Sequence, residues 1–258
     1  MIVGRLLQFF RPGSPTCSNS TGVYIPLYVY PSGSGMDEYE RVIRAKNAHL
    51  GVQLVVAINP SNGAGGSKDS NYERAAGMLR GAGIAVLGYV YTSWGRRSIG
   101  EVESEISRYA SWYGADGIMV DEFSTDVRLA GYYQKLRLYA KSLGMTFVMG
   151  NPGTDIPAQY VGAGGATAIA VADNFIIYEN AGLPSPERLG GWRRRRDKKK
   201  FSCCSYGVGR LDEKAIRTAS RYLGLLYVTD DVLPNPYDSL SSHFERIVAV
   251  LDPARQSD

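Results

Sequence analysis

Short apolar segments alternate with longer amphipathic segments along most of this chain. The apolar segments are rich in β-branched and aromatic residues and lack the strict apolar–polar alternation of half-exposed strands. Continuous hydrophobicity of this kind is typical of strands that are buried on both faces, as in parallel sheets. We therefore predict eight strands, at residues 23–30, 53–59, 84–91, 117–121, 146–150, 174–178, 201–206 and 225–229.

The amphipathic segments between these strands predict helices. Gly83, Gly114, Gly144 and Gly224 each precede a predicted strand, where a glycine can end a helix in the left-handed conformation. The predicted helices cover residues 36–47, 70–81, 99–113, 127–143, 156–161, 186–196, 212–223 and 239–251.

Eight strand–helix units favour the α/β class and a single (β/α)8 TIM barrel. The chain has 258 residues, and the usual length of such a barrel is about 250 residues. We expect an N-terminal arm at 1–22, a catalytic barrel at 23–252 and a C-terminal tail at 253–258, because the end segments carry Pro, Gly and Ser. No run approaches the roughly 20 apolar residues of a membrane-spanning helix, so we expect no membrane span.

Polar residues follow the predicted strands, and (β/α)8 enzymes build their active sites at the carboxyl ends of strands. The clearest case is the apolar run 117–120, which ends in the adjacent acids Asp121 and Glu122. Capping of a following helix is the alternative role for Asp121. The strand-end candidates for catalysis or substrate binding are Tyr28, Tyr30, Asn59, Tyr91, Asp121, Glu122, Asn151, Glu179, Asn180 and Asp230.

Carboxylates are the best candidates for catalysis in this set. The chain has only two histidines, His49 and His243, and both lie on predicted outer elements. A Ser-His-Asp triad or a histidine-rich zinc site is therefore not expected. Asp121 and Glu179 end the fourth and sixth predicted strands and can face each other across a barrel mouth, with Glu122 as a third acid. Paired carboxylates of this kind perform glycoside hydrolysis.

Tyrosine is abundant, with 18 residues against 7 phenylalanines. The rings of Tyr28, Tyr30 and Tyr91 can stack on sugar faces, while their hydroxyls bond to ring substituents. The alternative is that tyrosines simply fill the barrel. We expect a polysaccharide or oligosaccharide partner, and no cofactor or metal.

The net charge of +4 comes largely from the run Arg193–Lys200. A solvated helix end and loop explains such a run better than nucleic-acid binding, because no nucleic-acid motif accompanies it. Cys17, Cys203 and Cys204 have no metal-ligand spacing. We interpret them as packing residues.

Several motifs in this order resemble the spherulin-4 family. They are IPLYVYP at 25–31, INPSNG at 58–63, LGYVYT at 87–92, DGIMVDE at 116–122, NPGT at 151–154 and YEN at 178–180. That family includes glycoside hydrolases of family 135, which are (β/α)8 enzymes that cut α-1,4-linked N-acetylgalactosamine polymers. The resemblance covers most of the chain, but the Arg193–Lys200 run does not belong to its pattern.

The resemblance implies a retaining, endo-acting hydrolase of galactosamine-containing polysaccharide. Asp121 is then the nucleophile and Glu179 the acid/base, with the roles of Asp121 and Glu122 exchangeable. It also implies an extracellular or cell-surface setting, although residues 1–10 lack the apolar core of a signal peptide. The sequence leaves open the oligomeric state.

Two other function classes fit the same residues. One is a carbohydrate-binding barrel without turnover. The other is a magnesium-dependent lyase or isomerase that uses the acids as oxygen ligands.

Overall fold

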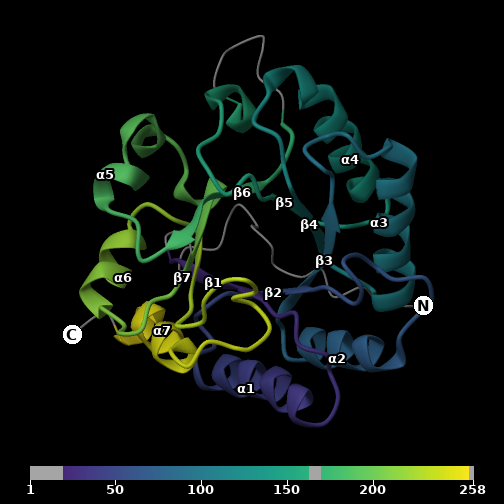
Figure 1. Ribbon diagram of the computed structural model, residues 1–258. Helices are drawn as coiled ribbons and strands as arrows, with labels where there is room; N and C mark the ends of the chain where they lie inside the picture. Colours follow the sequence, from purple (N-terminus) through teal and green to yellow (C-terminus); the bar gives the residue numbers. More distant parts are fainter. Residues whose placement is uncertain (1–19, 163–169, 256–258) are drawn as a thin grey trace.

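The computed structural model describes residues 20–162 and 170–255. Eight parallel strands follow one another around a closed barrel, and β8 pairs with β1 to close it (Figure 1). The predicted (β/α)8 fold is therefore confirmed. The strands are β1 (Gly22–Pro26), β2 (Leu54–Ile58), β3 (Ala85–Tyr91), β4 (Gly117–Asp121), β5 (Phe147–Gly150), β6 (Asn174–Ala181), β7 (Phe201–Tyr206) and β8 (Leu225–Val228).

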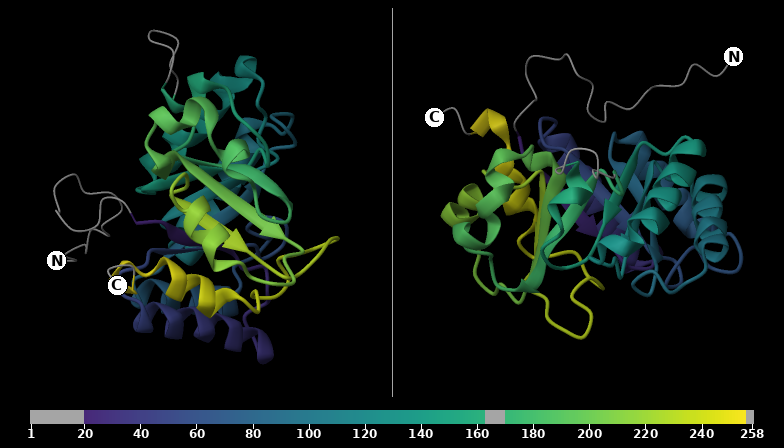
Figure 2. Two further views of the ribbon diagram at one scale, coloured as in Figure 1. Left: turned by 90° about the vertical axis from the view of Figure 1, so that its left-hand side faces the viewer. Right: turned by 90° about the horizontal axis from the view of Figure 1, so that it is seen from above.

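Helices surround the strands, and Figure 2 shows α7 beside α1, where the ring of helices closes. At this junction Nε of Arg41 in α1 donates to Glu245 of α7 at 2.9 Å. The α-helices are α1 (Ser34–Ala48), α2 (Ser70–Gly81), α3 (Ile99–Tyr113), α4 (Ala130–Ser142), α5 (Pro186–Leu189), α6 (Glu213–Ala219) and α7 (Phe244–Leu251). The short 3-10 helices are η1 (Val127–Leu129), η2 (Ala158–Val161), η4 (Gly191–Arg195), η5 (Lys198–Lys200) and η6 (Pro253–Arg255).

Several predicted helices are shorter or broken in the structure. The helix predicted at 212–223 already ends at Ala219. The segment predicted at 156–161 forms only η2, which starts after Pro157 and ends at the left-handed Gly162. The segment 186–196 breaks after α5 at Gly190 and Gly191, and Gly191 has a φ of 68°. The predicted helix 239–251 starts only at Phe244, because the hydroxyl and backbone N–H of Ser242 bond to Asp230 instead.

Strand β1 is shorter than predicted and ends at Pro26. Beyond it, the N–H of Leu27 still bonds to the carbonyl of Ala57 in β2 at 3.0 Å, whereas the N–H of Tyr28 bonds to the carbonyl of Tyr237 at 3.1 Å. This bond ties the segment after β1 to the loop between β8 and α7.

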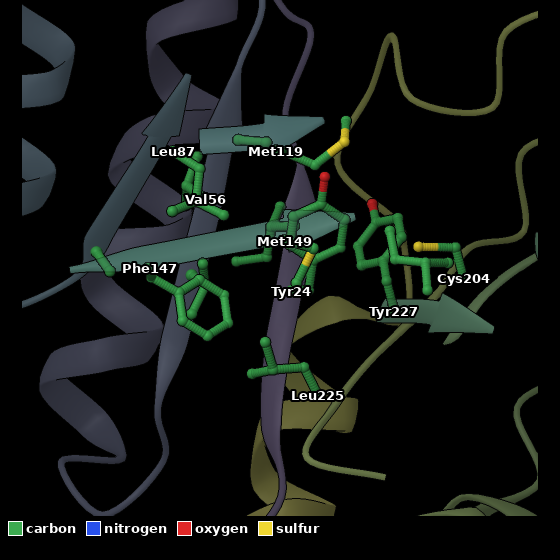
Figure 3. Packing of buried hydrophobic residues seen from close by; sticks show 14 of the residues in the cluster. Tyr24, Val56, Leu87, Met119, Phe147, Met149, Cys204, Leu225 and Tyr227 are labelled. Carbon is green, nitrogen blue, oxygen red and sulfur yellow. The ribbon is translucent and has the colours of Figure 1, made fainter. Parts of the chain in front are cut away.

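The register of the strands shows which side chains fill the barrel. Partnered residues of parallel strands point to the same face, so Tyr24, Leu87, Met119, Met149 and Cys204 share the interior. Figure 3 shows Tyr24 and Tyr227 close together, with Cys204 beside Tyr227. The barrel centre is a packed core rather than a pore.

The outer face of the barrel packs against the helices. At Gly88 in β3, a Cβ atom would lie 2.2 Å from the ring of Tyr109 in α3. Only glycine allows α3 to approach the strand this closely. The alternation of the strand then turns the next residue, Tyr89, into the barrel.

Most of the expected N-terminal arm lies outside the described residues, as do the last three residues of the expected tail. Among the helices that the structure does describe, none has the length and apolar character needed to cross a bilayer.

Candidate functional site

Two carboxylates share one amide at the mouth of the barrel. Nδ2 of Asn151, just after β5, donates to Oδ1 of Asp121 at 2.9 Å and to Oε2 of Glu179 at 2.7 Å. Asp121 ends β4 and Glu179 lies in β6, so three consecutive strands supply the cluster. We expected Asp121 and Glu179 to face each other across the mouth; the structure places them on strands separated only by β5 and joins them through Asn151.

A bulge in β6 turns Glu179 inward. The register pairs Ile176 with Ser202 but Tyr178 with Cys203, so one residue is inserted between them. Strict alternation from the inward-facing Ile176 would have sent Glu179 toward the helices. The bulge instead pairs Glu179 with the inward-facing Cys204. Bulges re-aim side chains in this way next to active sites.

Two tyrosines that sequence reasoning missed complete the hydrogen bonding. The Tyr89 hydroxyl donates to Oδ2 of Asp121 at 2.8 Å, and the Tyr237 hydroxyl donates to Oε1 of Glu179 at 2.5 Å. Alternation along β3 could have identified Tyr89, which lies two residues before Tyr91. No sequence signal identified Tyr237, because it lies in the loop between β8 and α7.

Burial and the neighbouring carboxylate make Asp121 harder to ionise, because they raise its pKa. Burial, and then the charge of Glu179, raise the pKa of Asp121 from 3.8 to about 6, while hydrogen bonds from Tyr89 and Asn151 oppose the shift. Burial and the nearby Asp121 carboxylate also raise the pKa of Tyr89 well above its usual range. The Tyr89 hydroxyl therefore remains a protonated donor across the physiological range.

An aromatic layer lies against the acids. The ring of Tyr28 packs edge-on against Tyr89 and Tyr237, with centroids 5.6 Å and 6.0 Å away. Burial first, and then several neighbouring charges including Asp121 and Glu179, raise the pKa of Tyr28. Tyr28 is thus the predicted tyrosine that the structure brings to the carboxylate pair.

Glu122 adopts a conformation that is uncommon for a residue with a side chain. Its φ is 49°, and its carbonyl accepts the N–H of Trp94 at 2.8 Å and the hydroxyl of Thr92 at 2.9 Å. Ser93 and Trp94 are also left-handed, with φ values of 48° and 55°. Such strain costs about 1–3 kcal/mol per residue and clusters at functional sites. Trp94 is 52% exposed beside this turn.

The other predicted binding residues lie around the rim, and Tyr91 pairs in register with Asp121. The Tyr30 hydroxyl bonds to Asp69 and Asn71, and Oδ1 of Asn59 accepts the N–H of Gly63. The guanidinium of Arg97 lies over the ring of Tyr91, 4.2 Å from its centre. The side chain of Asn180 accepts the N–H of Ala181. Asp230 accepts hydrogen bonds from the backbone N–H and the hydroxyl of Ser242.

Neither histidine joins the cluster. His49 bonds to Asp252 at 2.7 Å, and His243 bonds to the carbonyl of Val208 at 2.7 Å. Across residues 20–162 and 170–255, no group of three His, Cys, Asp or Glu side chains could hold a metal ion.

The fold and site define a (β/α)8 barrel with a hydrogen-bonded carboxylate pair at its mouth. Residues 22–251 match the model of spherulation-specific family 4, Spherulin4. The chain therefore belongs to the spherulin-4 family, as the sequence motifs predicted. Spherulin-4 of Physarum polycephalum is 31% identical over 246 residues, which cover 90% of this chain and 70% of that protein.

Solved structures share the fold. Sph3 of Aspergillus clavatus, determined in complex with GalNAc, superposes with a TM-score of 0.77 at 22% identity, covering 92% of this chain and 99% of that chain. The spore cortex-lytic enzyme SleL of Bacillus cereus follows with a TM-score of 0.55 at 11% identity, covering 93% and 75%. The YdjI aldolase of Escherichia coli has a TM-score of 0.53 at 14% identity, covering 92% and 88%. The same architecture thus accompanies different chemistries.

Proposed function

We propose that this protein is an endo-acting glycoside hydrolase that cleaves α-1,4-linked polysaccharide containing N-acetylgalactosamine or galactosamine. The observation that carries the proposal is the pair Asp121 and Glu179 bridged by Asn151. Membership of the spherulin-4 family and the fold shared with a GalNAc-bound barrel support the sugar class.

The spacing of the two carboxylates supports a retaining mechanism. Because one amide nitrogen contacts both, their nearest oxygens are closer than the roughly 6.5–9.5 Å that inverting enzymes need for a water between the carboxyl groups. In the first step Asp121 attacks the anomeric carbon, and Glu179 donates its proton to the leaving oxygen as the glycosidic bond breaks. In the second step Glu179 takes a proton from water, and the resulting hydroxide displaces Asp121 from the sugar.

The raised pKa of Asp121 favours a second assignment in which the two roles are exchanged. Restoring the activity of the Asp121 and Glu179 variants with azide distinguishes the two assignments. Azide enters from the face that the missing nucleophile occupied, so a nucleophile variant yields a glycosyl azide of inverted configuration. An acid/base variant yields one of retained configuration.

Aromatic and acidic groups at the mouth suit the proposed substrate. Tyr28 offers a ring beside the acids, and Trp94 offers an exposed ring beside Glu122. An acid-rich mouth attracts the cationic amines of deacetylated galactosamine units. We therefore expect partly deacetylated polymer to bind more tightly than fully acetylated polymer.

The experiment is incubation of the purified protein with acetylated and partly deacetylated α-1,4-galactosamine polymers, followed by mass spectrometry of soluble products. Asp121→Asn and Glu179→Gln should each abolish the release of oligosaccharides. The control is Glu103→Gln on the outer helix α3, which should keep full activity. Undiminished activity of the Asp121 and Glu179 variants would refute the proposal.

Calorimetric titration separates the other function classes. Oligosaccharide binding that persists in Asp121→Asn and Glu179→Gln, without product from the wild type, would indicate a binding barrel. Activity lost with a chelator and restored by magnesium would indicate the metal-dependent class.

A further inference from the structure

A basic pocket lies on the outside of the barrel, between the segment after α5 and the end of α6. Its volume is about 290 Å³. Among the described residues, no carboxylate lines it. The lining side chains are Leu189, Arg193, Arg194, Arg196, Lys198, Arg221 and Tyr222.

One of the five cations is neutralised and forms part of the wall. Arg193 is 7% exposed, forms an ion pair with Asp155 and donates to the carbonyls of Leu189 and Arg188. Its buried guanidinium thus fixes the course of the chain that carries Arg194 and Arg196.

The other four cations have no ion pair within residues 20–162 and 170–255. Hydrogen bonds at the start of α5, and more weakly the charge of Arg194, lower the pKa of the nearby Glu187. Burial lowers the pKa of Lys198, Asp197 opposes this shift, and the charge of Lys199 adds to it. A bound anion would relieve this concentration of positive charge.

Two of the cations are held in place by neutral groups. The ammonium of Lys198 donates to the Thr21 hydroxyl at 3.1 Å and to the Ser220 carbonyl at 2.9 Å. The guanidinium of Arg194 lies 5.5 Å from the centre of the Tyr222 ring. Part of the entropy cost of ordering these side chains around a ligand is therefore met before binding.

The pocket is separate from the carboxylate pair. Lys198 begins η5, which directly precedes β7, and Arg221 and Tyr222 precede β8, so the pocket lies toward the amino ends of these strands. Asp121 and Glu179 lie at the carboxyl ends of their strands. Occupancy of the pocket therefore requires no sugar at the mouth.

We infer that this pocket binds a phosphate-bearing anion. The guanidinium groups of Arg194, Arg196 and Arg221 can each donate a pair of parallel hydrogen bonds to phosphate oxygens, a geometry for which arginine is favoured over lysine. Lys198 adds a fourth charge to the lining. Free di- or polyphosphate and a phosphorylated lipid headgroup offer the same chemistry.

The test is calorimetric titration of the full chain with pyrophosphate. We expect binding with a Kd below about 1 mM at physiological salt, weakening as salt is raised. The double variant Arg196→Gln, Arg221→Gln should lose about tenfold or more in affinity, because it removes two charge-assisted contacts at exposed positions. The control is Arg74→Gln on α2, also exposed, which should bind as the wild type does.

Co-sedimentation with phosphatidylcholine vesicles that contain phosphatidylinositol phosphate identifies the source. Binding only to these vesicles, lost in the double variant, would assign the pocket to a lipid headgroup. No binding to either probe, or equal binding by the wild type and the folded double variant, would overturn the inference. Neither result depends on hydrolysis of a glycan.

Discussion

The hydroxyl of Tyr237 donates a 2.5 Å hydrogen bond to Oε1 of Glu179, although 58 residues separate them in the sequence. Charge-assisted hydrogen bonds of this kind contribute about 1.5–3 kcal/mol. We predict that Tyr237→Phe lowers kcat on the galactosamine polymer about tenfold or more and changes KM little, because the variant removes a donor without altering the shape of the ring. Steady-state kinetics measure both constants.

The matched control is Tyr178→Phe. Its hydroxyl donates to the carbonyls of Ala181 and Gly182, on the other face of β6. Equal losses of kcat in the two variants would mean that the Tyr237 hydroxyl has no special role at Glu179.

The bridging amide of Asn151 gives a second prediction. Asn151→Asp replaces a donor to two carboxylates with a third negative charge at nearly constant volume. The acid limb of the pH–rate profile should move to higher pH, because added negative charge raises the pKa of Asp121 further. Activity near neutral pH should fall at least about a hundredfold. The control is Asn47→Asp at an exposed position of the outer helix α1, which should leave the profile unchanged. An unchanged profile in Asn151→Asp would contradict the bridging role.

The pKa of Asp121 predicts a pH dependence of stability. Its value of about 6 in the folded protein exceeds the ordinary 3.8, so between these values the folded state binds more protons than the unfolded chain. This carboxyl therefore makes the protein less stable as the pH rises from about 4 to about 6. Asp121→Asn removes the penalty, and its stability relative to the wild type should improve by up to about 3 kcal/mol over this range.

Urea unfolding from pH 4 to pH 7 measures this difference directly. An effect of the Asp121→Asn substitution that does not depend on pH shifts the variant's whole curve of unfolding free energy against pH without changing its slope. Parallel curves for the two proteins would show that Asp121 titrates alike in the folded and unfolded states.

The contact between Gly88 and Tyr109 predicts a loss of stability without any change at the acids. Gly88→Ala places a Cβ 2.2 Å from the Tyr109 ring, and overpacking of this kind typically costs about 1–3 kcal/mol. Gly77→Ala in α2 is the control, because a Cβ there meets nothing within 4 Å. It should raise stability by up to about 1 kcal/mol. Thermal unfolding compares them, and equal melting temperatures for Gly88→Ala and the wild type would contradict the close packing.

The sequence by itself determined the barrel and most of its order. Although β1 ends four residues early, all eight strands overlap the apolar runs that predicted them, because strands buried on both faces need continuous hydrophobicity. The change from apolar to polar residues also located Asp121, Asn151 and Glu179 at or near strand ends. Parallel pairing brings these ends to one rim of the barrel. Where glycine and proline interrupted a segment, as at Pro157 and Gly190, the predicted helices were too long.

Only the tertiary structure decided how the site is assembled. The direction of Glu179 depends on the bulge after Ile176, which arises from pairing with β7 and leaves no clear period in the sequence. The contact of Tyr237 with Glu179 depends on how the loop after β8 crosses the mouth. Side-chain direction in a strand follows from local alternation, whereas a register shift and a loop crossing follow from long-range packing, which the order of residues alone does not reveal.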